Sequence, residues 1–380
     1  MAEAYLSGAI TQAIERARQL SAVIDQRYPP AYDGLRQICS ERLRSVLDHL
    51  RDLQSETIAD PALQTPRRLR MYRRAVSQLR SVETIGAPAL ASADEDSARL
   101  SSIVRAVCDE LNYPLVPPIV TNRSTSYLGI YADFNLMMAP LLEGRFLLHL
   151  PDLYHELAHP LLHARYDDHA RLDPYRRAYL AALHAVETYF RNAQLAASRD
   201  RAPADFKGYL LLWEANWKTF WLEEFFCDAF AALTCGPAFG WAHLHLTAKN
   251  RGGAFETPVD RSESHPADDA RFRLIMRCMK LSGFNADASS LDEKWGELIA
   301  ARNDEKPPEY MQCYPDDLID TVEAAVRLSL ENMGVVVALP GGLANWTGRL
   351  NDAWAEFWRA PEGYARWEQN QLRLASQVLT

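Results

Sequence analysis

The sequence lacks the long apolar runs that a membrane span requires. No stretch of about eighteen apolar residues occurs in its 380 residues. Residues 1–20 also lack the basic start and the apolar block of a secretory leader. Hydrophobic residues make up 48% of the chain and charged residues 24%, which is typical of a globular protein. We therefore expect a soluble, cytoplasmic protein with no membrane span.

Closely spaced cysteine pairs are also absent. The six cysteines, at positions 39, 108, 227, 235, 278 and 313, never form a C-x-x-C pattern. Cys227 and Cys235 are eight residues apart on what should be one helix, which is too far for a disulfide. We expect free thiols in a reducing compartment.

Basic residues are outnumbered, 41 against 50 acidic residues. The resulting net charge of −9 argues against general nucleic-acid binding. Six arginines nevertheless gather within residues 66–83, and Leu69, Tyr72, Val76 and Leu79 recur among them at helical spacing. Such a run can bind phosphate or an acidic partner, but the spacing favours the solvated face of an amphipathic helix.

The chain is too long for one core, and its apolar spacing suggests three parts. Within residues 1–115, this spacing predicts a bundle of helices over 1–28, 32–54, 66–83 and 94–111, with a loop at Gly86–Ala93. Strand-forming runs occur at 127–131, 134–138 and 145–150, and helical spacing returns from 173 onward with a turn at 234–240. We predict a mainly α fold with a small β-sheet (α+β), divided into segments 1–115, 116–282 and 283–380.

The pattern H-E-x-x-H stands at His155, Glu156 and His159, within a stretch that predicts a helix. Histidines four residues apart share one helical face, so both imidazoles can reach a single ion. Glu156 then stands near the ion, where a general base is needed. Pro151 suits the first helical turn, whereas Pro160 removes an amide and predicts a kink or an end there.

A third metal ligand must come from elsewhere. The extended metzincin pattern would place Gly at 162 and His at 165, but these are Leu162 and Arg165. His163 lies on the same face, yet three histidines on consecutive turns of one helix close a tetrahedron poorly, so we expect a packing or supporting role.

Glu224 and Asp228 are better candidates, because they lie four residues apart on a strongly apolar helix. Buried carboxylates are costly unless they are paired or bound to metal. We predict that Glu224 binds the ion and that Asp228 accepts an N–H from a ligand histidine. Glu223 is the rival ligand, and the alternative for the whole pair is ionic pairing with arginines.

H-E-x-x-H followed by E-x-x-x-D resembles the thermolysin-like gluzincin metallopeptidases. The stretch Ser264-His265-Pro266 followed by Arg271 is similar to the S-H-P-x-x-x-x-R element of the CAAX prenyl endopeptidase family. The resemblance covers about residues 127–275 and implies a zincin-like catalytic core flanked by helical bundles. It also implies that His265 donates a hydrogen bond to the oxyanion; otherwise His265 is an N-terminal cap of a helix that begins near Pro266.

These observations predict a zinc-dependent peptidase that acts on a peptide or protein substrate. Zinc would be held by His155, His159 and Glu224, with Glu156 as general base. The alternative is a helical interaction or regulatory protein with an inactive or purely structural metal site. A structural site needs a fourth protein ligand, and His163, His243 and His245 are the available side chains. The oligomeric state is left open by the sequence.

Overall fold

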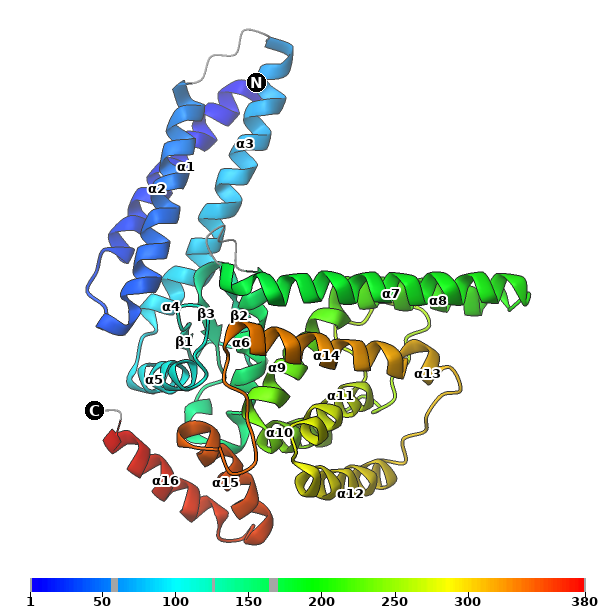
Figure 1. Cartoon of the computed structure of the whole chain (residues 1–380). Coiled ribbons are helices and arrows are strands. Elements are labelled where there is room, and N and C mark those ends of the chain that lie inside the picture. Colours follow the sequence, from blue (N-terminus) through cyan, green and yellow to red (C-terminus); the bar gives the residue numbers. More distant parts are fainter. Residues whose placement is uncertain (1, 56–60, 125–126, 164–169, 379–380) are drawn as a thin grey trace. The chain divides into compact units, whose positions relative to one another are not determined.

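The computed structural model describes residues 2–55, 61–124, 127–163 and 170–378, which are mainly helical with one small sheet (Figure 1). Arg165 of the metzincin comparison lies outside these residues. Among the described residues, no helix combines the length and apolar content that a membrane span requires. The contacts divide the chain into two units, 1–101 with 118–141, and 102–117 with 142–380. This division differs from the three predicted segments.

The first unit is built on three long helices. They are α1 (Ala2–Ile24), α2 (Asp33–Ser55) and α3 (Pro61–Ser81), followed by a π-helical turn (Val82–Gly86), α4 (Ala87–Ala91) and the start of α5 (Glu95–Glu110). Leu43, Val46 and Leu50 recur at helical spacing on α2 and are buried in the core of this unit.

The loop predicted at Gly86–Ala93 is wrong, because the helical turns continue to Ala91. A Cβ at Gly86 would overlap the Cys39 sulfur and come within 3.0 Å of the Phe134 ring. Glycine therefore allows a close helix contact here, and it does not mark a turn.

A three-stranded sheet belongs to the first unit. Its strands are β1 (Ile119–Thr121), β2 (Gly129–Tyr131) and β3 (Leu136–Met138), in the order β1-β3-β2. β3 pairs parallel with β1 and antiparallel with β2. The strands predicted at 127–131 and 134–138 are thus present but shorter. The strand predicted at 145–150 is wrong, since 143–145 and 147–149 are 3-10 turns.

The second unit is entirely helical after these turns in the part of the chain that is described. Its helices are α6 (Asp152–His163), α7 (Asp173–Arg199), α8 (Ala204–Asn216), α9 (Leu222–Cys235), α10 (Pro237–Lys249), α11 (Asp268–Leu281), α12 (Asn285–Arg302), α13 (Tyr310–Cys313), α14 (Asp316–Met333), α15 (Asn345–Arg359) and α16 (Tyr364–Val378). A π-helical turn (Trp217–Trp221) joins α8 to α9. α9 packs against α6, α11 and α14 and is the central helix of the unit.

Three local predictions in this unit need correction. α6 continues through Pro160 to His163, so the missing amide does not end the helix. Only Gly236, with φ 74°, separates α9 from α10, so most of the turn predicted at 234–240 is helical. α11 begins at Asp268 after the N-cap Ala267, so Pro266 precedes the helix.

Two expectations about surface and core are confirmed. All six cysteines are buried and free. Five of the six arginines of the run are exposed, namely Arg67, Arg70, Arg73, Arg74 and Arg80. Arg68 is the exception, since it is buried, pairs with Glu3 and donates to the carbonyl of Leu53.

Candidate metal centre

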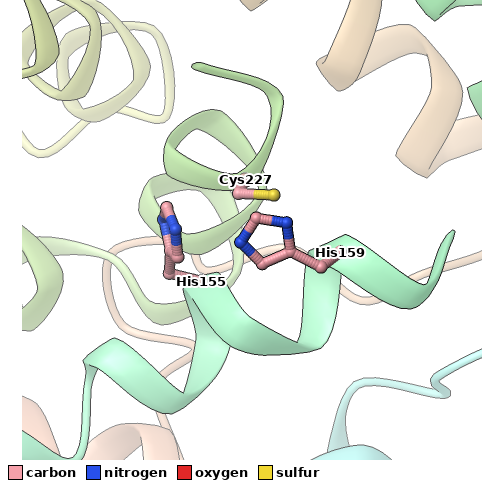
Figure 2. A group of neighbouring side chains, drawn as sticks. All are labelled: His155, His159 and Cys227. Carbon is pink, nitrogen blue, oxygen red and sulfur yellow. The ribbon is translucent and has the colours of Figure 1, made fainter. Parts of the chain in front are cut away.

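The two motif histidines project from α6 toward α9 (Figure 2). Their ring centroids are 5.2 Å apart, with the planes nearly perpendicular. Leu153, Leu157 and Leu161 are all buried, as the predicted apolar face requires. The side chains of His155 and His159 are 10% and 17% exposed, so both rings are held mostly within the protein.

Glu224 of α9 meets both imidazoles. Its Oε2 lies 3.3 Å from Nε2 of His155, and its Oε1 lies 4.0 Å from Nε2 of His159. Two ligands bound to one tetrahedral ion at about 2.0–2.1 Å stand roughly 3.4 Å apart, close to the first distance. Oε2 is buried and has no hydrogen-bond partner among the described residues. A buried carboxylate whose two oxygens each face one imidazole nitrogen, with no hydrogen-bond partner for Oε2, fits a cation-binding site.

Asp228 lies one helical turn beyond Glu224 and orients His155. Its Oδ1 is 2.9 Å from Nδ1 of His155, which leaves Nε2 on the side of Glu224. Arg271 of α11 donates two hydrogen bonds of 2.7 Å to the same carboxylate. Burial alone would raise the pKa of Asp228, but Arg271 and His155 outweigh it and hold the pKa far below its usual value. Asp228 therefore combines the predicted orienting role with the arginine pairing considered as its alternative.

Glu223 orients the second histidine. Its Oε1 lies 2.7 Å from Nδ1 of His159 and 2.7 Å from Nε2 of His163. Burial would raise the pKa of Glu223, but these two histidines lower it to about 2, so the group is a carboxylate. From the sequence, Glu223 was expected only as a rival ligand. The adjacent Glu223-Glu224 pair and the extra His163 on α6 are the sequence signals for this role.

The electrostatic field at the centre favours positive charge. Burial would lower the pKa of His155, but Asp228 and Glu224 outweigh burial and raise it to about 10. A site that stabilises a proton on this ring so strongly can stabilise a divalent cation in its place. The donor set of two imidazoles and one carboxylate, each imidazole backed by another carboxylate, fits zinc.

Glu156 interacts electrostatically with His155, His159 and Glu224 and has no fixed partner. The residue is buried, and no hydrogen bond or ion pair joins its carboxylate to another residue of the described ranges. Burial raises the pKa of Glu156, while the charges of His155 and His159 lower it by less. An unpaired carboxylate with a raised pKa is suited to accept and return a proton.

Cys227 is a neighbour that sequence reasoning missed. Its sulfur, one ring nitrogen of His155 and one ring nitrogen of His159 all lie within 4.8 Å of one another (Figure 2). Cys227 is fully buried, and burial followed by the charge of Glu224 raises the pKa of its thiol well above the usual value. A bound metal ion displaces the proton of a coordinating thiol, so Cys227 is a rival of Glu224 as third donor.

His265 lies at the rim of the centre. Its Nε2 is 3.9 Å from Oε2 of Glu224, its Nδ1 is 2.9 Å from the Ser264 hydroxyl, and its side chain is 63% exposed. It does not cap α11, because that helix starts after Ala267 without a side-chain cap. The exposure of His265 and of His163, which is 54% exposed, indicates the side from which solvent reaches the centre.

The two remaining histidines considered as fourth ligands have other partners. Nε2 of His243 is 2.9 Å from the carbonyl oxygen of Asp268. The ring of His245 lies 5.4 Å from that of His149. Neither belongs to the group formed by His155, His159 and Cys227.

No protein-family model, curated protein or solved structure matches this chain. The resemblance to gluzincins therefore still rests on the motifs alone.

Proposed function

We propose that the chain is a zinc-dependent peptidase with a zincin-like core, in which His155, His159 and Glu224 hold the metal. One observation carries the proposal: both Nε2 atoms face the Glu224 carboxylate, at 3.3 and 4.0 Å, while both Nδ1 atoms are engaged by other carboxylates. Peptidases that hold zinc with two histidines and one glutamate leave a further position for water. The three ligands and their supporting acids come from α6 and α9.

When bound, the zinc ion supplies Lewis-acid chemistry that makes water a stronger acid and polarises a carbonyl. Glu156 is the residue that takes the proton from the attacking water and returns it to the leaving amine. With zinc in place of the Nε2 proton, the Nδ1–H groups of His155 and His159 would donate to Asp228 and Glu223, and each Nε2 would face the metal. His265, whose Nε2 lies 3.9 Å from Oε2 of Glu224, would donate a hydrogen bond to the developing oxyanion.

Cys227 supports a second candidate, a structural metal site without catalysis. With His155, His159 and Glu224 it would make four protein ligands and leave no position for water. The substitution Cys227→Ser separates the two candidates. A peptidase keeps its zinc in this variant, whereas a closed structural site loses most of its affinity.

The substitution Glu156→Gln tests the peptidase directly. We expect this variant to bind zinc as the wild type does and to hydrolyse an unstructured protein such as casein about 10²- to 10⁴-fold more slowly. Glu83→Gln, in the exposed ion pair with Arg16, is the matched control and should leave hydrolysis unchanged. Equal rates for wild type and Glu156→Gln would remove Glu156 from the mechanism.

A further inference from the structure

A cavity of about 530 Å³ lies in the second unit among α10, α12 and α15. This volume is in the range of small-molecule binding sites. Its walls come from three helices of one unit, together with Phe284, which precedes α12, and Leu343, which precedes α15. None of the residues that hold the candidate metal centre lines it.

Two tryptophans form an aromatic corner of the cavity. Trp241 of α10 and Trp358 of α15 have ring centroids 5.1 Å apart and planes tilted by 50°. Trp358 is 41% exposed, which is unusual for so large an apolar side chain. Trp241 is only 8% exposed, and its indole N–H donates to no other residue of the described ranges. The corner therefore offers aromatic faces and one N–H without a protein partner.

The same cavity is lined by three carboxylates, those of Asp287, Glu293 and Asp352. None of them forms an ion pair within the described ranges. Lys294 also lines the cavity, and its ammonium group is paired with Glu297 at 2.7 Å, so that charge is already balanced. Asp287 lies in the first turn of α12, where the helix dipole explains an acid. Glu293 and Asp352 lie inside α12 and α15, so helix capping explains neither.

We propose that this cavity binds an organic cation with a guanidinium or alkylammonium head. A cation over an indole face is attracted by the ring quadrupole, and the carboxylates of Glu293 and Asp352 add direct charge complementarity. The cavity is larger than a cationic head alone, so an apolar stem would pack beside Phe284 and Leu343. A carbonyl on the ligand would satisfy the N–H of Trp241, which favours an arginine or lysine side chain on a peptide over a free polyamine.

The probes are acetyl-arginine methylamide, acetyl-lysine methylamide and spermidine, titrated into the full chain by calorimetry in about 0.15 M salt. We expect saturable one-to-one binding of at least one probe. Tighter binding of an amino-acid amide indicates a peptide side chain, and tighter binding of spermidine indicates a free amine. Acetyl-citrulline methylamide, a neutral isostere of the arginine probe, should bind at least about tenfold more weakly.

Two variants locate the site. Trp358→Ala and the double substitution Glu293→Gln with Asp352→Asn should each weaken binding at least about tenfold, and both change exposed side chains that the fold tolerates. Asp292→Asn is the control, since Asp292 is exposed on α12 beside Glu293 but does not line the cavity. It should leave affinity within about twofold. The absence of saturable binding by all three cations, or binding that both variants leave unchanged, would overturn the proposal.

Discussion

The two units bury charge very differently. Among the described residues of the first unit, Arg68 is the single buried charged side chain. The second unit buries nine acids and histidines, including His155, Glu156 and Asp228. Burying a charged side chain costs free energy, whereas burying an apolar one does not. In the second unit, several of the buried charged side chains gather at one centre. The first unit is thus organised by its apolar core, whereas the second also holds a charged site within its core.

Removing one partner of the buried pair should produce the largest difference between the units. Arg271→Met leaves the Asp228 carboxylate, which is fully buried, without its arginine. We expect the second unit to lose about 3–5 kcal/mol of unfolding free energy. Arg16→Met breaks the exposed pair with Glu83 in the first unit and should cost about 1 kcal/mol or less.

Urea unfolding can separate these effects, because all nine tryptophans lie between residues 213 and 367, in the second unit. Tryptophan fluorescence therefore reports the second unit, and far-UV circular dichroism reports both. A loss below about 1 kcal/mol for Arg271→Met would show that the buried pair contributes no more than a surface one.

Removing the proposed carboxylate ligand should abolish the stabilisation of the second unit by zinc. Glu224→Ala takes away one of three proposed ligands, so we expect at least about a hundredfold weaker zinc binding. Zinc should raise the midpoint of the fluorescence transition of the wild type and leave that of the variant unchanged. Glu15→Ala, an exposed site in the first unit, serves as control. Equal zinc responses of the variant and the wild type would assign the ligand role to Glu223 or Cys227.

A smaller difference should appear on acidification. Burial, followed by the charges of Lys249 and His149, lowers the pKa of His245 to about 4. The unfolded chain, with a histidine pKa of about 6.5, takes up the proton first as the pH falls. The second unit should therefore lose stability between about pH 6.5 and pH 4.

We expect His245→Gln to reduce this pH-dependent loss of unfolding free energy by roughly 1–2 kcal/mol. This figure is smaller than the full pKa difference implies, because the ring is only half-buried. His49→Gln, at an exposed position of the first unit, should leave the pH dependence of the fluorescence transition unchanged. If His245→Gln left that dependence unchanged as well, the low pKa of His245 would be wrong.

The long helices were predictable because their apolar spacing is local. α2 matches its predicted range within one residue at each end, and α7 begins at residue 173, where helical spacing was predicted to return. The short strand β1 was missed, since three residues after a double proline carry no periodicity. The run 145–150 was predicted as a strand from its composition, but the amide of Leu147 donates to the Glu368 carboxylate, a partner distant in sequence. Long-range contacts of this kind decide the structure of short segments.

The candidate site shows the same limit. Spacing within α6 and within α9 was enough to select His155, His159, Glu224 and Asp228. The role of Glu223 depends on two histidines of the other helix, and the nearness of Cys227 depends on how α6 packs on α9. A sequence fixes which residues share a helix face, but not which faces meet.

Anomalous scattering at the zinc edge, on a crystal of the full chain grown with zinc, would locate the metal ion and its ligands together. We expect one strong peak at about 2.0–2.2 Å from Nε2 of His155, Nε2 of His159 and an oxygen of Glu224, with water as the fourth ligand. A peak bound by Cys227 without water, or no peak beside these two imidazoles, would contradict the proposed zinc site.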